Sequence, residues 1–322
     1  MIAGARVLVT GAAGFLGANL VRALLNAGAH VIAVARAASD CARLRQVEPQ
    51  IRLLRNDLCD LPTTPALAGV EVDLVYHLAS AGVDQRMHDV HRMIASNASG
   101  THDALLAATR LKAQRFVHVG SSAEYGPGRL LTEDHVLAPT GEYGATKVAA
   151  TLLARAYSHR TGLPVVTVRP FSVYGPWEAA YRLIPHCVLR ALAGLTVDIT
   201  DGRQTRDFVY AADVMDGLLR AGSVPEAAGA TVNLSTGVST SVRDIAERAV
   251  ALCGNPGVSI AVARTHQSTE MWTTSGDPRR AEQILGWLPR TTVDDGLRRT
   301  IEWLRMEADA YPELYHQQTH AG

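Results

Sequence analysis

The sequence predicts an α/β fold, a doubly wound parallel sheet followed by a smaller C-terminal α/β lobe. In the first half, short apolar segments rich in Val, Ile and Leu alternate with segments of helical spacing. This alternation is the pattern of a parallel sheet covered on both faces. The first apolar segment runs directly into three glycines and then into a helical segment. In the second half, apolar segments are shorter and Pro and Gly more frequent, which predicts a lobe at the carboxyl edge of the sheet.

The three glycines follow a predicted strand at 6–10 and precede a helix from about Ala18. Gly11 allows a tight turn, Gly14 lets the backbone approach a pyrophosphate, and Gly17 lets the helix pack closely on the strand. The helix N-terminus then faces the anion. The segment therefore predicts a Rossmann-like dinucleotide-binding unit, with cofactor contacts at Gly11, Gly14, Phe15, Leu16 and Gly17.

The other elements follow from the same periodicities. Further strands of the sheet are expected near 30–34, 51–54, 72–77, 115–120 and 164–168. Helices are expected at about 87–111, 143–161, 180–194, 211–221, 241–253 and 293–308, with a loop at 126–140. We expect a dinucleotide-binding domain over 1–170 and a mainly substrate-binding lobe over 171–322, some of whose segments return to the sheet. Residues 311–322 are expected to be a loose tail.

Charge and cysteine content exclude several classes of partner. Basic and acidic residues number 31 each, so the formal net charge is zero, which gives no reason to expect nucleic acid or an anionic membrane. No apolar run approaches membrane-spanning length. The four cysteines are far apart, which is typical of reduced thiols in a cytoplasmic protein. His88 and His91 share a helix face, but no carboxylate or cysteine completes a metal site, so we expect no metal.

The residue after the second strand usually reads the adenosine ribose, and an acidic residue there suits NAD. This sequence has Arg36 there, with Ser39 close by. A guanidinium beside a hydroxyl suits a 2′-phosphate, so NADP(H) is favoured and NAD(H) stays possible; the alternative is that Arg36 is merely exposed. Further cofactor contacts are expected after the third and fourth strands, at Asp57 and Leu58 beside the adenine and at Leu78, Ala79 and Ser80 beside the phosphates and nicotinamide ribose.

Tyr143 and Lys147 share one face of the helix predicted at 143–161. A phenol has an unperturbed pKa of about 10, and an ammonium one turn away favours the phenolate and lowers that pKa. The fifth strand ends in Ser121 and Ser122 at the same edge of the sheet. A Ser/Tyr/Lys set beside a nicotinamide is the minimum needed to move a proton and a hydride at a carbinol carbon.

Several motifs together resemble the extended short-chain dehydrogenase/reductases that act on nucleotide sugars. Besides the glycine pattern and the Ser/Tyr/Lys set, these are His77-Leu-Ala, Asn97-Ala-Ser-Gly-Thr101, Arg169-Pro-Phe-Ser-Val-Tyr-Gly-Pro176 and Arg206-Asp-Phe-Val-Tyr-Ala-Ala-Asp213. The resemblance covers nearly the whole chain and specifies the family better than the reaction.

The resemblance implies a role for each matching residue. Tyr143 would be the catalytic acid or base, Lys147 would hold the nicotinamide ribose and tune Tyr143, and Ser121 would bond the reacting oxygen, with Ser122 as the alternative. His77 would lie behind the nicotinamide or simply pack in the core. Further cofactor contacts are implied at Asn97, Pro170 and Val173.

Departures from the family patterns narrow the reaction. The 4,6-dehydratases carry an acidic pair directly after the catalytic hydroxyl, where this chain has Ser122 and Ala123. Glu124 lies one residue further on and is not a clean replacement. The sequence motif Gly-Ser-Ser-Ala-Glu-Tyr-Gly is most similar to that of the GDP-4-keto-6-deoxymannose reductases, which also tend to have Arg after the second strand. Many 4-epimerases carry Asp at that ribose position.

The expected function is therefore NADPH-dependent reduction of a nucleotide-linked 4-keto(-6-deoxy) sugar. An NAD-dependent nucleotide-sugar 4-epimerase using the same residues is the alternative, and a non-catalytic cofactor-sensing regulator is a third. The segment 265–271 departs from the family where the nucleotide base is held. In the family, helices such as 87–111 and 143–161 pair into a four-helix interface, so we expect a homodimer. The nucleotide-diphosphate sugar is expected to contact Ser122, Glu124, Ser172, Arg182 and Arg206.

Overall fold

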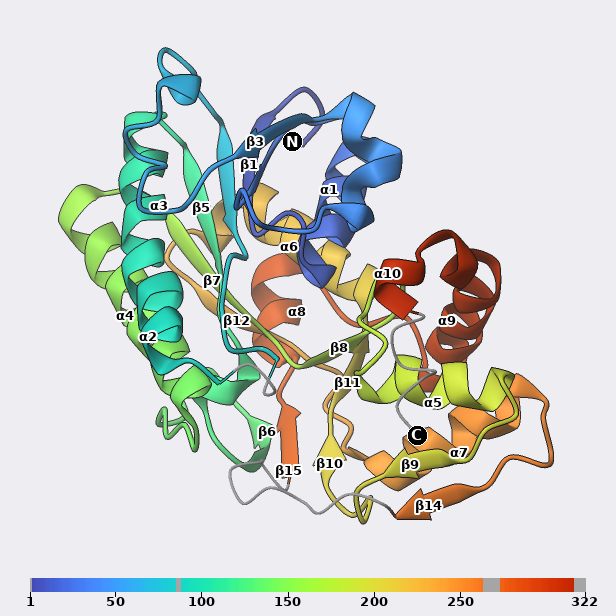
Figure 1. Cartoon of the computed structure of the whole chain (residues 1–322). Coiled ribbons are helices and arrows are strands. Elements are labelled where there is room, and N and C mark those ends of the chain that lie inside the picture. The colour runs from blue at the N-terminus through green and yellow to red at the C-terminus, as the bar shows by residue number, and fades with distance from the viewer. Residues whose placement is uncertain (1, 85–87, 263–272, 316–322) are drawn as a thin grey trace.

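The computed structural model describes residues 2–84, 88–262 and 273–315. Its centre is a seven-stranded sheet in the order β12-β7-β5-β4-β1-β2-β3 (Figure 1), in which every pair is parallel. This architecture confirms the predicted doubly wound fold. The strands are β1 (Arg6–Thr10), β2 (His30–Ala35), β3 (Arg52–Arg55), β4 (Leu74–His77), β5 (Arg115–Val119), β7 (Val165–Pro170) and β12 (Thr231–Leu234).

Helices cover both faces of this sheet. On one face lie α1 (Phe15–Asn26), α6 (Ala211–Ser223) and α8 (Arg279–Leu285), and on the other lie α3 (Gly100–Arg110) and α4 (Glu142–Thr161) (Figure 1). Side chains of a strand alternate between the two faces. Val7 and Val9 accordingly join the core beneath α1 and α6, whereas Leu8 joins the core beneath α3 and α4. Because strands from residues 6 to 234 share one sheet, the second half of the chain completes the sheet that begins with the glycine turn.

The helix expected at 87–111 is not uniform. It consists of α2 (Val90–Met93), a π-helical turn η3 (Ile94–Ser99) and then α3. A π-helical turn is uncommon and frequently lies at a functional site. Here it contains Asn97, whose side chain is buried and bonded to two other segments, as described below.

The second lobe is built from small sheets and helices (Figure 1). A four-stranded sheet has the order β13 (Thr240–Ser241), β10 (Thr205–Arg206), β15 (Thr273–Gly276) and β6 (Gly128–Leu131). Two further pairs are β8 (Ser172–Tyr174) with β11 (Phe208–Tyr210), and β9 (Val197–Ile199) with β14 (Ile260–Val262). The helices of this lobe are α5 (Leu183–Leu192), α7 (Val242–Cys253), α9 (Val293–Glu307) and α10 (Pro312–Tyr315), and the 3-10 turn η6 (Ala308–Ala310) lies between the last two. The other 3-10 turns lie in segments that connect strands of the seven-stranded sheet: η1 (Ala42–Gln50), η2 (Pro65–Leu67), η4 (Ser122–Glu124) and η5 (Pro225–Ala227).

Two expectations are wrong in the second lobe. The segment 126–140 contains the edge strand β6, whose partner among the described residues is β15 from far along the chain, so the local sequence gives little indication of this strand. The tail is not loose up to 315, because Tyr311 and Tyr315 are each 2% exposed and their rings contact Trp177 and Trp303 respectively. Within the described residues, no helix combines the length and apolarity needed to cross a bilayer.

Candidate active site at the carboxyl edge of the sheet

The glycine turn between β1 and α1 is built to receive an anion. Gly11 has φ +69°, and a Cβ there would lie 2.6 Å from the Ala79 nitrogen. A Cβ on Gly17 would lie 2.1 Å from the Gly11 oxygen, so only glycine fits at both positions. The N-cap Gly14 provides no side-chain cap for α1, which leaves the first helical amides open to a phosphate. Phe15 and Leu16, the first residues of α1, are half-buried.

Two arginines meet at the turn after β2. Arg36 is exposed at this turn, as its expected role at the ribose requires. Arg55, the last residue of β3, donates from Nη1 to the carbonyl oxygens of Ser39 at 2.7 Å and Arg36 at 3.4 Å. Sequence reasoning missed Arg55, because only the pairing of β2 with β3 brings it beside this turn. Asp57 is exposed just beyond β3, and Leu58 is half-buried.

His77, at the end of β4, anchors the loop formed by Leu78, Ala79 and Ser80. Burial lowers the pKa of this histidine to about 3, so its ring is neutral. Its Nε2 lies 3.0 Å from the Thr101 hydroxyl, which donates its own hydrogen to the Asn97 carbonyl at 2.6 Å. Nε2 must therefore carry the ring proton.

The other ring nitrogen continues the chain. Nδ1 of His77 accepts from the Thr10 hydroxyl at 2.8 Å, and the Thr10 oxygen accepts from the Ala79 amide at 3.4 Å. These bonds run from α3 through the sheet to the predicted cofactor loop. The structure thus assigns His77 to positioning this loop, the role that the sequence left open.

Asn97 ties the same loop to α4. Its side chain accepts from the Ala81 amide at 2.7 Å and donates to the Ala81 carbonyl at 3.0 Å. Its Nδ2 also donates to the Thr146 hydroxyl at 2.9 Å, between Tyr143 and Lys147 on α4. Asn97 is 1% exposed. Its side chain therefore acts as a brace, and its predicted contact with cofactor stays a prediction.

The structure brings Ser121, which follows the carboxyl end of β5, together with Tyr143 and Lys147, which lie in the first two turns of α4. The hydroxyls of Ser121 and Ser80 lie beside the Tyr143 phenol and lower its pKa, but burial raises it by more. Lys147 is 3% exposed and donates from Nζ to the Val119 carbonyl at 2.6 Å. Burial lowers the pKa of Lys147 to about 8.

The predicted lowering of the Tyr143 pKa by Lys147 is wrong for this structure, because burial outweighs the influences that favour the phenolate. The phenol is therefore protonated at neutral pH. A protonated phenol donates a proton, and a phenolate accepts one. In its protonated state the Tyr143 phenol can donate a hydrogen bond to an oxygen bound beside it.

The expectation that Glu124 binds substrate is wrong. Its side chain is 0% exposed, and Oε2 pairs with Nε of Arg169 at 2.9 Å. Its Oε1 accepts from the Ser121 amide at 2.8 Å. Both oxygens of the Glu124 carboxylate are thus occupied, one of them by the backbone of Ser121. Ser122, the first residue of η4, is half-buried, and its role stays a prediction.

The second lobe contributes the predicted substrate arginines. Arg182, just before α5, is exposed and lies near enough to Tyr143 for its charge to lower the phenol pKa. Arg206, on β10, donates to the Thr205 carbonyl at 2.9 Å. The buried Asp207 accepts from Thr236, Gly237 and Gly276, which binds this strand to the neighbouring segments. Ser172 and Val173 on β8 are half-buried, and Pro170 is buried at the end of β7. The segment 265–271 lies outside the described residues.

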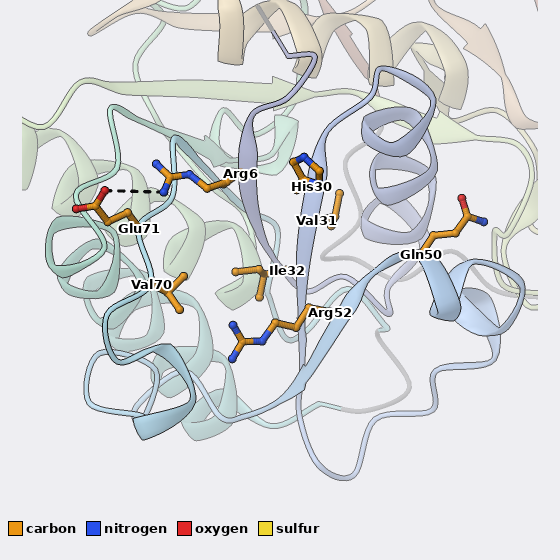
Figure 2. A pocket seen from close by; sticks show the side chains of 8 residues that line it. All are labelled: Arg6, His30, Val31, Ile32, Gln50, Arg52, Val70 and Glu71. Atoms are coloured by element: carbon orange, nitrogen blue, oxygen red, sulfur yellow. Dashed lines mark ion pairs between the residues drawn. The ribbon is translucent and has the colours of Figure 1, made fainter.

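Figure 2 shows a hollow at the opposite edge of the sheet, lined by Arg6, His30, Val31, Ile32, Gln50, Arg52, Val70 and Glu71. Arg6, His30 and Arg52 are the first residues of their strands, so this hollow is remote from the carboxyl edge. Arg6 is paired there with Glu71 at 3.8 Å.

Across the described part of the chain, no group of three or more His, Cys, Asp or Glu residues could hold a metal ion.

Residues 7–235 match the model of the NAD dependent epimerase/dehydratase family. The chain belongs to this family. The match confirms the resemblance and the prediction of an NAD(P)-dependent enzyme. The matched region runs from the second residue of β1 to just beyond β12, so it includes all of the seven-stranded sheet except Arg6.

Relatives in this family carry out different reactions. The chain is 30% identical to a dTDP-glucose 4,6-dehydratase of Actinoplanes sp. over 93% of this chain and 98% of that one. It is also 30% identical to a UDP-glucose 4-epimerase of Mycolicibacterium smegmatis, with the same coverage. The structure of a UDP-glucuronic acid 4-epimerase from Bacillus cereus, in complex with UDP-glucuronic acid and NAD, superposes with a TM-score of 0.83 at 27% identity. The superposition covers 94% of this chain and 99% of that one.

Proposed function

We propose that this protein is a ketoreductase that uses NADPH to reduce a nucleotide-linked 4-keto(-6-deoxy) sugar to the hydroxy sugar. The observation that carries the proposal is the pair of arginines, Arg36 and Arg55, at the turn after β2, where the adenosine ribose is expected. Two guanidinium groups suit a 2′-phosphate, and a phosphorylated cofactor that exchanges at each turnover suits net reduction.

Tyr143 and Ser121 can supply the proton and the hydrogen bond that reduction needs. When bound, the reduced nicotinamide supplies the hydride that adds to the carbonyl carbon. Tyr143 donates its proton to the carbonyl oxygen, and the Ser121 hydroxyl donates a hydrogen bond to the same oxygen. Lys147 stabilises the phenolate that remains. This proton, together with the hydride from the bound cofactor, would convert the ketone to the alcohol.

The sugar nucleotide is held by the second lobe in this proposal. Arg182 and Arg206 pair with the diphosphate, because guanidinium groups form charge-assisted hydrogen bonds with phosphate oxygens. Ser122 and Ser172 contribute hydroxyls beside them. The exposure of Arg182 and its proximity to Tyr143 support this placement, because a diphosphate bound there lies next to the reacting sugar.

An NAD-dependent 4-epimerase is the second candidate. The UDP-glucose and UDP-glucuronic acid 4-epimerases among the relatives favour it, and the same three residues serve oxidation and re-reduction of one sugar. A 4,6-dehydratase is disfavoured although such enzymes are also relatives. The acidic pair is replaced by Ser122 and Ala123, and Glu124 is buried in an ion pair.

Isotope transfer separates the two candidates. NADPH carrying deuterium at C4 of the nicotinamide is incubated with a 4-keto-6-deoxy sugar nucleotide, and the product is analysed by mass spectrometry and NMR. Reduction predicts one deuterium at the new carbinol carbon for each NADPH oxidised. The control is a saturated sugar nucleotide without added cofactor, which a reductase leaves unchanged. Interconversion of two 4-epimers in that control, with no net oxidation of NADPH, would establish the epimerase instead.

A further inference from the structure

A buried ion pair lies directly beneath the catalytic serine. Glu124 is 0% and Arg169 4% exposed at the side chain, and their Oε2 and Nε atoms are 2.9 Å apart. Each group has a second partner. Oε1 of Glu124 accepts from the Ser121 amide at 2.8 Å, and Nη1 of Arg169 donates to the Tyr125 hydroxyl at 2.8 Å. The carboxylate therefore joins β7, which carries Arg169, to the backbone of Ser121.

The same turn fixes the direction of the Ser121 hydroxyl. Ser121 is the N-cap of η4, and its Oγ accepts from the Ala123 amide at 3.1 Å. With Glu124 bonded in return to the Ser121 amide, the turn forms a reciprocal capping box. Because the Ser121 Oγ accepts a hydrogen bond from the Ala123 amide, the hydroxyl hydrogen of Ser121 can point toward the Tyr143 phenol, which lies within hydrogen-bonding reach.

We propose that Glu124 is a positioning residue for Ser121: held by Arg169, it fixes the turn that aims the serine hydroxyl at the reacting oxygen. The inference rests on the proposed function only in taking Ser121 as the group that binds this oxygen. It applies equally to a reductase and to an epimerase.

The neighbouring residues are matched to this arrangement. A Cβ on Gly120 would lie 2.4 Å from Oε1 of Glu124, so the glycine leaves room for the carboxylate. Beyond Arg169, the Tyr125 hydroxyl donates to Oδ1 of Asn233 on β12 at 2.8 Å. Asn233 donates in turn to the Leu131 carbonyl at 2.8 Å. The pair is thus connected through Tyr125 and Asn233 to two further strands, β12 and β6.

Replacing Glu124 by Gln keeps the shape and removes one acceptor. The single amide oxygen can serve either Arg169 or the Ser121 amide, and the amide nitrogen then faces a donor. We expect Glu124→Gln to lower kcat by roughly 10–100-fold, the cost of misplacing a catalytic group by about 1 Å. The KM for the sugar and the Kd for cofactor should change little.

Asp213→Asn is the matched control. Asp213 on α6 is also buried, and its Oδ2 accepts from the backbone amides of Arg290 at 3.2 Å and Thr291 at 2.9 Å, but it makes no described contact with Ser121, Glu124 or Arg169. A purely structural role for Glu124 predicts that Glu124→Gln and Asp213→Asn both lower Tm and kcat in parallel. A positioning role predicts that Asp213→Asn lowers Tm alone.

A double-mutant cycle tests whether Glu124 acts through the serine. If it does, Glu124→Gln lowers kcat in the parent and has almost no further effect in Ser121→Ala, where no hydroxyl remains to be aimed. Equal fold losses in both backgrounds would overturn the inference. If Glu124→Gln does not fold, Gly120→Ala displaces the same carboxylate and enters the cycle in its place. Failure of the proposed function looks different: the parent then shows no ketoreductase turnover, and the cycle is measured on the epimerase reaction.

Discussion

Removing the guanidinium of Arg36 should weaken binding of NADPH and leave NADH nearly unchanged. The two cofactors differ only in the 2′-phosphate, and Arg36 lies on the turn after β2 where that group is expected. A hydrogen bond to a charged group contributes about 1.5–3 kcal/mol. Because Arg36 is exposed, solvent and salt bring the value to the lower end, so Arg36→Ala should raise the Kd for NADPH about tenfold.

Arg55 should contribute in two ways. Its bonds to the Ser39 and Arg36 carbonyls hold the turn, and its charge adds to that of Arg36. Arg55→Ala should therefore weaken NADPH strongly and NADH slightly. Arg52→Ala is the matched control: Arg52 is also exposed on β3 but begins the strand, at the opposite edge of the sheet, and its loss should affect neither cofactor.

The assay is a fluorescence titration of each variant with both cofactors at low and high salt. The preference for NADPH, expressed as the Kd for NADH divided by the Kd for NADPH, should fall as the salt concentration rises, because exposed charges are screened. Equal affinity of the parent protein for NADH and NADPH would refute the reasoning. So would an equal loss for both cofactors in Arg36→Ala.

Three further predictions follow from the site and from α4. Tyr143→Phe should bind cofactor normally and lose turnover by roughly 100-fold or more, because only the general acid is removed; near-parent activity would exclude Tyr143 from this role. The value of kcat/KM should fall as pH rises through about 8, because burial lowers the pKa of Lys147 from 10.5 to about 8 and the ammonium is lost above that pH. A kcat/KM that stays constant up to the pKa of a free phenol, about 10, would contradict this. We also propose a homodimer formed through α4, where Leu152 and Leu153 are 51% and 39% exposed. Leu152→Glu should then convert the protein to a monomer in light scattering, and a monomeric parent would overturn the assignment.

The sequence alone predicted the sheet, the glycine turn and the Tyr143–Lys147 pair. Each of these depends on residues close together in the chain. Alternation of apolar residues specifies a buried strand, three glycines between a strand and a helix specify a phosphate turn, and a spacing of four places two side chains on one helix face. Such local patterns can be recognised without knowing which distant segments pack against them.

Only the tertiary structure shows which partners the charged and polar groups have. Glu124 and Arg169 are 45 residues apart, and nothing near Glu124 in the sequence distinguishes a substrate-binding carboxylate from one that is buried and paired. Arg55 reaches the turn at Ser39 only because β2 and β3 are neighbours. The state of Tyr143 was misjudged for the same reason: the sequence shows the nearby ammonium, whereas the pKa of the phenol depends on how much water the surrounding segments exclude.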